Sequence, residues 1–317
     1  MKHIAVIIPA YKVKNRVLNV IAAIGDEVST IILVDDACPQ KTADYVKENC
    51  LDPRLVIIKN SVNLGVGGAV KAGYYKGLTI GTDIMVKIDG DGQMDPRLIS
   101  DLCAPILNEQ ADYIKGNRFF NPRSLAQMPK IRLLGNAIIS FLCKLASGYW
   151  SIMDPSNGFT AIDTRILREL PLDKISNRYF FESDMLFRLA IVKAKVSDFP
   201  MHSRYAGEHS SLSITKTAAT FPFKFLKRFI KRLGYSYYLR GFNVASLFLI
   251  VGICLFGFGI VSGVMSWSNS IATNIPATSG QVMLAALPIF VGLQLLLSFI
   301  NYDVSNEPRE PISKYLL

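Results

Sequence analysis

The feature that most constrains this chain is a run of 61 residues, Gly241 to Asn301, without any Asp, Glu, Lys or Arg. Within it, residues 242–264 and 282–300 are each long enough, as helices, to cross the ~30 Å hydrocarbon core of a bilayer. A buried hairpin in a soluble protein is the alternative, and the length of the uncharged run argues against it. We therefore expect two membrane spans joined by a loop over 265–281.

Charge is concentrated outside this run. The chain carries a formal net charge of +10, and residues 219–240 contain six Lys or Arg and no acidic residue. Because positively charged flanks stay on the cytoplasmic side, both ends are expected in the cytoplasm and the loop outside. The expected organisation is a soluble domain over 1–218, a basic amphipathic helix over 219–240, a transmembrane hairpin over 241–301 and a cytoplasmic tail over 302–317.

The positive charge also predicts an anionic partner. No recognition helix or RNA-binding signature accompanies it, so anionic lipid headgroups are favoured over nucleic acid. Five cysteines without a CxxC pair and only three histidines argue against a structural zinc site and fit a reducing cytoplasm. We expect no signal peptide, because Met1-Lys2-His3 leads directly into a strand-like run without a cleavage site.

Short β-branched runs alternate with helical stretches through the first 90 residues. Such runs are typical of strands buried on both faces, and the alternation predicts a doubly wound α/β domain with a mainly parallel sheet. Ligands bind beyond the carboxyl ends of the strands in such domains. The expected strands lie at 4–9, 31–34, 55–58 and 84–88, and the expected helices at about 14–25, 40–50 and 66–80.

Asp89 and Asp91, in the segment Asp89-Gly90-Asp91, follow the fourth expected strand directly. Two carboxylates at this spacing suit one Mg²⁺ or Mn²⁺ ion, which accepts one or two carboxylates together with phosphate oxygens. Such an ion would neutralise a departing diphosphate. An ordinary Asp-Gly turn is the simpler alternative. The position after a strand and the nearby Gln93 and Pro96 favour the metal interpretation.

Asp35 and Asp36 follow the second expected strand and are candidates to hold a base or ribose, with a turn or helix cap as the competing interpretation. The glycine-rich segment 63–73 is not a dinucleotide fingerprint, because Val70 stands at the third glycine position and the segment does not follow the first strand. A glycine-rich helix start near a sugar nucleotide suits it better.

Two amphipathic segments are candidates for the membrane interface. Residues 131–147 place apolar side chains at helical spacing, with Arg132 and Asn136 together on another face. A helix packed on the soluble domain is the alternative. Residues 221–240 combine an apolar stripe with Lys and Arg, which favours binding to anionic lipid over a solvated basic helix.

Six motifs follow one another in a fixed order: VIIPAY at 6–11, VDDACP at 34–39, NLGVGGAVKAG at 63–73, IDGDGQMDP at 88–96, KGNRF at 115–119 and DPSNGFTAI at 154–162. Together they resemble the family 2 glycosyltransferases of GT-A fold. Within that family the set is most similar to the dolichyl-phosphate-mannose and polyprenyl-phosphate-glucose synthases. The resemblance covers residues 1 to about 215, and the two-span tail matches many bacterial members.

The resemblance implies roles for individual residues. The nucleoside would be held by Pro9, Ala10, Tyr11, Asp35 and Asp36. Asp89 would also contact the nucleotide. The metal and diphosphate would meet Asp89, Asp91 and Gln93. Phosphates would be contacted by Arg118 and by the late Arg204, because a guanidinium binds phosphate oxygens in pairs. The acceptor phosphate would be bound by Arg132 and Asn136.

Four points stay open at this stage. Lys12 stands where the family often has an acidic residue, so a carboxylate contact from that loop is in doubt. Asp184, or its neighbour Glu182, is either a catalytic base or a group that orients arginines or the donor sugar. A lipid phosphate needs no base, since its second pKa is about 6. The histidines are expected to be exposed or satisfied, and Arg123 lies in a variable stretch.

The resemblance implies inverting transfer of one sugar from a UDP- or GDP-hexose to polyprenyl phosphate at the cytoplasmic membrane face. Another glycolipid or a polysaccharide is the alternative acceptor, although the Gln-x-x-Arg-Trp motif of processive synthases is absent. A non-enzymatic membrane scaffold is the third interpretation, which the intact motif set disfavours. Expected partners are the nucleotide sugar, the polyprenyl phosphate and anionic lipids, and homo-oligomerisation stays open.

Overall fold

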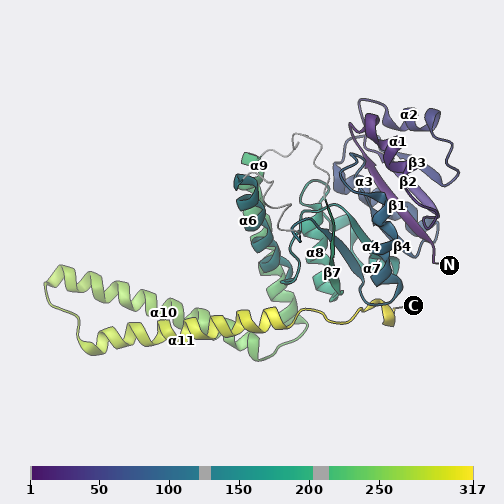
Figure 1. Ribbon diagram of the computed structural model, residues 1–317. Coiled ribbons are helices and arrows are strands. Elements are labelled where there is room, and N and C mark those ends of the chain that lie inside the picture. The colour runs from purple at the N-terminus through teal and green to yellow at the C-terminus, as the bar shows by residue number, and fades with distance from the viewer. Residues whose placement is uncertain (1, 121–129, 203–213, 317) are drawn as a thin grey trace. The chain divides into compact units, whose positions relative to one another are not determined.

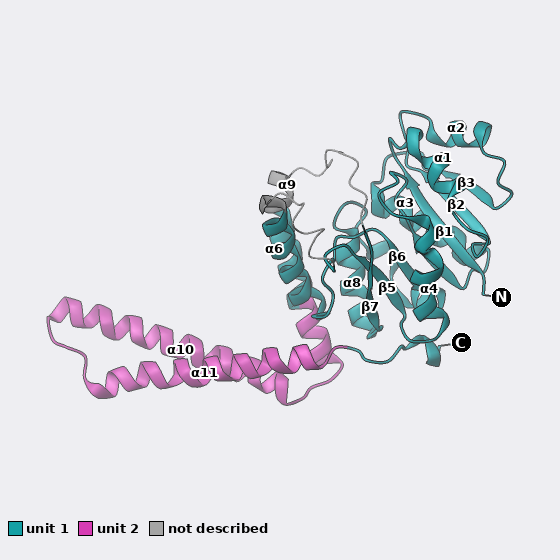
Figure 2. Cartoon of the chain, viewed as in Figure 1, with its two compact units in different colours: residues 1–230, 308–317 teal, residues 231–307 magenta. Residues whose placement is uncertain are grey.

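The computed structural model describes residues 2–120, 130–202 and 214–316, with side chains from residue 133 and residue 220 onward in the latter two. Two compact units are present: residues 1–230 with 308–317, and residues 231–307 (Figure 2). The expected tail 302–317 is therefore divided between the units. Its last ten residues belong to the first.

Unit 1 is built on a seven-stranded sheet with the order β3-β2-β1-β4-β6-β5-β7 (Figure 1). The pairings of β1 with β2 and β4, of β2 with β3 and of β5 with β7 are parallel, whereas β6 runs antiparallel to both β4 and β5. The expected mainly parallel α/β sheet is confirmed. The strands are β1 Ile4–Ala10, β2 Thr30–Asp35, β3 Leu55–Lys59, β4 Ile84–Lys87, β5 Tyr113–Asn117, β6 Thr160–Asp163 and β7 Val196–Pro200.

Helices connect and cover these strands. Those between the first five strands are α1 Lys14–Ala22, α2 Thr42–Asn49, α3 Val66–Thr79 and α4 Ile99–Leu107, the last preceded by the 3₁₀ turn η1 Pro96–Leu98. The remaining helices of unit 1 are α6 Lys130–Ser147, α7 Thr164–Glu169, α8 Phe181–Val192 and most of α9 Ile214–Leu233, with 3₁₀ turns η2 Leu172–Lys174 and η4 Ser313–Tyr315.

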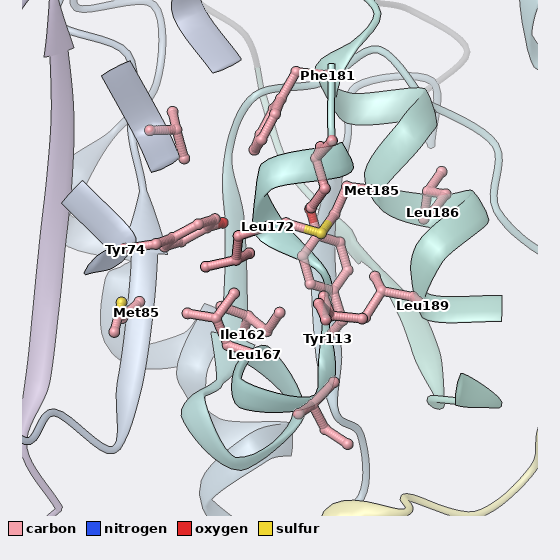
Figure 3. Close-up of a cluster of buried hydrophobic side chains, with 14 of the residues drawn as sticks. Tyr74, Met85, Tyr113, Ile162, Leu167, Leu172, Phe181, Met185, Leu186 and Leu189 are labelled. Atoms are coloured by element: carbon pink, nitrogen blue, oxygen red, sulfur yellow. The ribbon is translucent and has the colours of Figure 1, made fainter. Parts of the chain in front are cut away.

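The alternation within β1 shows why the sheet is buried on both faces. Ala5 and Ile7 pack into one apolar cluster with Tyr74 of α3, while Val6 and Ile8 pack into a second cluster on the opposite face. Successive strand residues point to opposite faces, so a continuous apolar run supplies both cores at once. Figure 3 shows the first cluster, where Tyr74, Met85, Tyr113, Met185 and Leu189 converge from α3, β4, β5 and α8.

Unit 2 is a helical hairpin made of α10 Val244–Thr273 and α11 Ser279–Ser305, preceded by a π-helical turn, η3 Gly234–Leu239. Both helices are long and apolar enough to cross a membrane. At 1.5 Å per residue they are about 45 and 40 Å long. The expected loop over 265–281 was too wide, because α10 continues to Thr273 and the connection shrinks to residues 274–278.

Glycines let the two helices of unit 2 approach closely. A Cβ atom added at Gly259 would lie 2.7 Å from the Ala285 carbonyl oxygen, and one at Gly292 would lie 2.6 Å from the Phe256 nitrogen. Small residues at such crossings are typical of helices that associate in a bilayer. Near the start of the hairpin, Asp303 of α11 accepts hydrogen bonds from the Arg232 guanidinium (2.6 and 3.0 Å) and the Tyr237 hydroxyl (2.6 Å).

Candidate functional site

The Asp89-Gly90-Asp91 segment lies at the carboxyl end of β4, where a buried lysine meets it. The Lys87 ammonium lies 2.9 Å from Asp89 Oδ1 and 3.1 Å from Glu182 Oε1, and its side chain is 1 % exposed. Burial by itself would lower the pKa of Lys87, but the two carboxylates outweigh it and raise that pKa. Lys87 therefore stays charged and fixes Asp89 beside Glu182.

Asp91 is held on the turn that follows. Its Oδ1 accepts the backbone N–H of Gln93 at 3.0 Å, and the Arg16 guanidinium donates to its backbone carbonyl at 3.1 Å. Burial raises the pKa of Asp91, and the nearby charge of Asp89 adds to the increase, while the Gln93 N–H, Lys87 and Arg16 oppose it. The Asp91 carboxylate thus sits where an added cation would be favourable.

These residues fit a divalent cation of the Mg²⁺ or Mn²⁺ type. Asp89 and Asp91 bring carboxylate oxygens, and Gln93 brings an amide oxygen. Among the described residues, no group of three or more His, Cys, Asp and Glu side chains could hold a metal by itself. Mg²⁺ needs only one or two carboxylates when substrate phosphates complete its coordination. Gly158 is required beside the site, since a Cβ there would lie 2.5 Å from Asp89 Oδ2.

Asp35 and Asp36 are both anchored to backbone N–H groups. Asp35 accepts from Cys38 (2.7 Å) and Ala43 (2.8 Å), which orients the start of α2. Asp36 accepts from Leu64 (2.9 Å) and Gly65 (2.7 Å), which fixes the glycine-rich segment before α3. These hydrogen bonds are the ones expected if Asp35 and Asp36 stabilise a turn and a helix start. A nucleoside contact by these aspartates stays a prediction.

The remaining nucleoside candidates lie at the end of β1. Pro9 and Ala10 pair with Val34 and Asp35 of β2, and the Ala10 carbonyl accepts the Asp36 N–H at 3.2 Å. Tyr11 follows with 43 % of its surface exposed. An exposed aromatic ring beyond the carboxyl end of a parallel sheet is available to a ligand.

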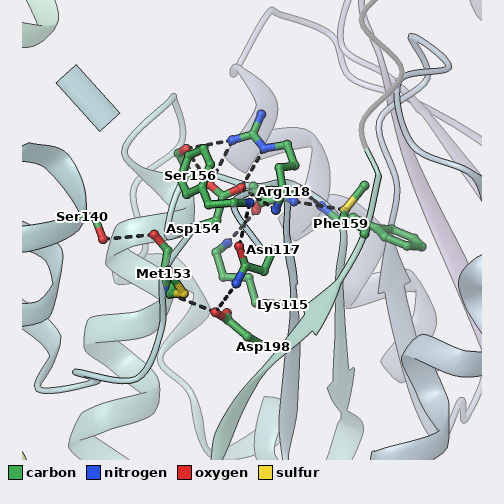
Figure 4. Close-up of polar contacts among 12 residues, drawn as sticks. Lys115, Asn117, Arg118, Ser140, Met153, Asp154, Ser156, Phe159 and Asp198 are labelled. Atoms are coloured by element: carbon green, nitrogen blue, oxygen red, sulfur yellow. Dashed lines mark hydrogen bonds and ion pairs between the residues drawn. The ribbon is translucent and has the colours of Figure 1, made fainter. Parts of the chain in front are cut away.

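Arg118 brings two of the sequence motifs together (Figure 4). Its Nε lies 2.7 Å from Asp154 Oδ2 and its Nη2 lies 2.9 Å from Asp154 Oδ1, while Nη2 also donates to the Ser156 hydroxyl at 3.2 Å. Asp154 is fully buried and the Arg118 side chain is 17 % exposed. The planar guanidinium is thus pre-oriented by a forked ion pair.

Two further titratable residues lie near Arg118: the buried Lys115 of β5 and the half-buried Asp198 of β7. The Lys115 ammonium donates to the Asn157 carbonyl at 2.6 Å, and burial lowers its pKa to about 8. Asp198 of β7 accepts from Asn117 Nδ2 and the Met153 N–H, both at 2.9 Å. Burial raises the pKa of Asp198 to about 6, although the Met153 N–H and Lys115 act in the opposite direction.

Asp184 is fully buried near the start of α8. Arg228 of α9 donates to it twice, from Nε to Oδ1 at 2.7 Å and from Nη2 to Oδ2 at 3.0 Å, and the Ser176 N–H and hydroxyl each donate at 2.9 Å. A general base must reach the proton that it removes. In this geometry Asp184 holds an arginine through two hydrogen bonds, and its role in the reaction stays a prediction.

The two acceptor candidates lie on α6. The structure describes the backbone of Arg132 but not its side chain, and Asn136 is half-buried. Leu134, Ile138 and Phe141 of the same helix are more than half exposed. Arg204, Arg123 and the loop from Gly207 to Ser211 lie outside the described residues.

Several residues of this region were not singled out from the sequence. Lys87 had a signal, because a lysine between Val86 and Ile88 in a buried strand needs a partner for its charge. Asp154 and Lys115 lay within quoted motifs without an assigned role. Arg228 was expected on a lipid-facing basic surface. Arg228 and Arg232 each form an ion pair with a buried aspartate far away in the sequence, and lipid binding by this helix stays a prediction.

Two relatives are similar to this chain in sequence. The chain is 31% identical over 218 residues to a UDP-N-acetylglucosamine–dolichyl-phosphate N-acetylglucosaminyltransferase of Methanococcus voltae, covering 64% of this chain and 86% of the relative. It is 28% identical over 199 residues to an undecaprenyl-phosphate mannosyltransferase of Micrococcus luteus, covering 62% and 81%.

Among solved structures, the glucosyl-3-phosphoglycerate synthase of Mycobacterium tuberculosis, crystallised with Mn²⁺ and UDP, has a similar fold. Its TM-score is 0.53 at 16% identity, over 74% of this chain and 80% of that one. At this identity the likeness shows the fold alone. Residues 5–171 match the model of glycosyl transferase family 2, just over half of the chain. The protein therefore belongs to glycosyl transferase family 2.

Proposed function

We propose that the protein transfers one sugar from a nucleotide diphosphate sugar to polyprenyl phosphate at the cytoplasmic face of a membrane, with inversion at the anomeric carbon. One observation carries the proposal: the family 2 sheet and its polar motifs share a chain with two apolar helices of 30 and 27 residues. The Methanococcus and Micrococcus relatives, both named for polyprenyl-type phosphate acceptors, support the acceptor class.

Asp89, Asp91 and Gln93 would hold the metal, and Lys87 keeps Asp89 in place for it. A bound Mg²⁺ or Mn²⁺ supplies positive charge to the diphosphate as negative charge develops there. Arg118, oriented by Asp154, adds a guanidinium for the same phosphates. Arg204 is proposed to act with it. The nucleoside is proposed to lie against Pro9, Ala10, Tyr11, Asp35 and Asp36.

An oxygen of the lipid phosphate attacks the anomeric carbon from the face opposite the diphosphate. The new bond joins that oxygen to the sugar, and the bond between the sugar and the nucleotide diphosphate breaks, with the electron pair leaving on the diphosphate. No proton needs to be removed, because a phosphate monoester with a second pKa of about 6 is already ionised near neutral pH. This agrees with Asp184 being fully engaged by Arg228 and Ser176.

The proposed membrane orientation rests on the distribution of Lys and Arg and on the attachment of both ends of the hairpin to unit 1. Asp112 accepts the N–H groups of Ile312 and Ser313 (both 2.9 Å) and of Lys195 (2.7 Å), which fixes residues after the second apolar helix to unit 1. Both ends of the hairpin thus connect to the same unit. With Lys and Arg concentrated outside the spans, the positive-inside rule puts that unit and both termini in the cytoplasm.

Anionic lipids are the proposed surroundings of α9. Three lysines of this helix are exposed, and so are three of its large apolar side chains at helical spacing. Exposed basic and apolar side chains on one helix suit an interface with anionic headgroups. These residues are Lys224, Lys227, Lys231, Phe223, Leu226 and Ile230.

The test is transfer by the purified protein from radiolabelled UDP-glucose, UDP-N-acetylglucosamine or GDP-mannose to undecaprenyl phosphate. We expect metal-dependent label in a lipid whose sugar is joined through phosphate. Label only in a glycolipid or polysaccharide would contradict the acceptor, and absence of any donor turnover would contradict the enzyme proposal.

Arg132→Ala tests the acceptor site within that assay. Loss of a hydrogen bond to a charged phosphate costs about 1.5–3 kcal/mol, so we expect roughly ten- to a hundredfold lower efficiency with the lipid. Donor binding should stay near normal by titration calorimetry. A collapse of donor affinity with an unchanged apparent lipid constant would move Arg132 to the donor site.

A further inference from the structure

The loop over residues 173–178, which begins within η2 and leads towards α8, is bound tightly to α3. A backbone N–H, a lysine and a tyrosine of α3 each donate a hydrogen bond to it. The pairs are Gly68 N to Asn177 O (2.9 Å), Lys71 Nζ to Ile175 O (3.0 Å) and Tyr75 Oη to Asp173 Oδ1 (2.6 Å). The position of this loop and the position of α3 are therefore linked.

The contact is closest at the glycine-rich start of α3. A Cβ at Gly65 would lie 2.8 Å from the Asn177 carbonyl oxygen, and one at Gly67 would lie 2.7 Å from Phe181 Cβ and overlap the Ser176 carbonyl. Gly65 also has a positive φ of 87°, which disfavours other residues there. Backbone packs directly on backbone at this point, so a shift of the loop is transmitted to α3.

The other side of the same glycine-rich segment is held by Asp36, which accepts the N–H groups of Leu64 and Gly65. Asp36 follows β2 at the carboxyl edge of the sheet, where the nucleoside is proposed to bind. The glycine-rich segment thus lies between that candidate donor site and the 173–178 loop.

Asp184 connects the loop to α9. One of its oxygens, Oδ2, accepts the Ser176 N–H and hydroxyl, and it also accepts Arg228 Nη2, while Oδ1 accepts Arg228 Nε. A lysine could not replace this fork, because an ammonium cannot donate two parallel bonds in a fixed plane.

Aromatic packing fixes where α9 presents Arg228. The ring of Phe225, 2 % exposed, lies 5.0 Å from that of Phe180 and 6.1 Å from that of Phe221, in edge-to-face geometry. The Arg228 guanidinium itself lies 5.3 Å from the centre of the Phe187 ring. Two independent kinds of contact therefore hold α9 against α8.

We infer that Arg228 is a positioning residue that couples the juxtamembrane helix α9 to the nucleotide-sugar site. The connection runs from Arg228 through Asp184 and Ser176 to the glycine-rich start of α3. The inference rests on the proposed function for its donor class. It means that displacement of α9 changes donor affinity without any contact between α9 and the donor.

The first test compares Arg228→Met with Arg168→Met, a matched change at an exposed position of α7, in the full-length protein. Titration with UDP-glucose, UDP-N-acetylglucosamine and GDP-mannose should show donor binding weakened about two- to thirtyfold in Arg228→Met and unchanged in Arg168→Met. Arg228→Lys should be intermediate. A folded Arg228→Met protein with wild-type donor affinity would overturn the inference.

Amide hydrogen exchange without donor provides the second readout. Amides of residues 64–69 should exchange faster in Arg228→Met and as in wild type in Arg168→Met, and equal exchange in both would overturn the coupling. If Arg228→Met does not fold, Ser176→Ala is used instead, because it removes only the hydroxyl hydrogen bond to Asp184. Amides of residues 64–69 should then exchange faster by a smaller amount, and unchanged exchange would overturn the coupling. Wild-type protein that binds none of the donors refutes the proposed function, while hydrogen exchange still decides the coupling.

Discussion

The guanidinium of Arg118 forms a forked ion pair with the buried carboxylate of Asp154, at 2.7 Å from Nε to Oδ2 and 2.9 Å from Nη2 to Oδ1. The two residues are 36 positions apart and belong to different sequence motifs. The arginine proposed to bind the donor phosphates is therefore positioned by the segment that carries Asp154.

Asp154→Ala should lower both stability and activity. Removing one partner of a buried pair leaves an uncompensated charge and costs about 3–5 kcal/mol. Thermal unfolding in detergent and initial rates would measure the two effects. Asp44→Ala is the control, since its ion pair with Lys59 is exposed and should contribute little to the melting temperature. Equal melting temperatures for the two variants would contradict a structural role for the pair.

Asp91→Ala should abolish transfer while the protein stays folded and membrane-bound. The reason is the position of the half-buried Asp91 on the turn after β4, where its carboxylate is proposed to bind the metal. Transfer assays with added Mn²⁺ and with excess EDTA would check this, together with the binding of Mn²⁺ itself. Asp101→Ala, at an exposed position of α4, is the control. Full wild-type activity in EDTA would refute the metal assignment.

Asp198→Asn should change how stability depends on pH between about 4 and 6. The pKa of Asp198 is about 6 in the folded protein, against about 3.9 for an unperturbed Asp. In that window the folded state binds a proton that the unfolded state has released. The contribution of Asp198 to stability therefore falls as pH rises from 4 to 6.

The measurable quantity is the melting temperature of wild type minus that of Asp198→Asn. This difference should decrease between pH 4.5 and 6.5. The exposed Asp101→Asn should show no such trend. A difference that is constant, or that increases with pH, would mean that the Asp198 carboxyl is not protonated at these pH values.

The connection between α10 and α11 should face away from the cytoplasm. A cysteine in place of Ile275, which is 67 % exposed, should react with an impermeant thiol reagent in intact cells, after the exposed Cys254 has been removed. A cysteine in place of the exposed Glu310 is the matched control and should react only after permeabilisation. The opposite pattern of labelling would invert the topology.

Local pattern was enough to predict much of this fold. Four strands were expected from short β-branched runs, and each is present within two residues of its expected ends, because continuous apolar runs can be buried only between two cores. The strand β5, the antiparallel strand β6 and the edge strand β7 were not predicted as strands. Their pairing partners lie up to about 80 residues away, and that pairing is not visible in local periodicity.

The sequence by itself determined the family, the two apolar helices and the carboxylates of the Asp89-Gly90-Asp91 turn, because these depend on composition and short spacing. Only the tertiary structure decided which charges are used internally. Arg228 and Arg232 look like solvent-facing residues on a helical wheel, yet each pairs with a distant buried aspartate. Lys87, between Asp89 and Glu182, is the same case. Such pairs form because removing a charge from water is costly unless an opposite charge meets it, and chain spacing does not record which distant residue that is.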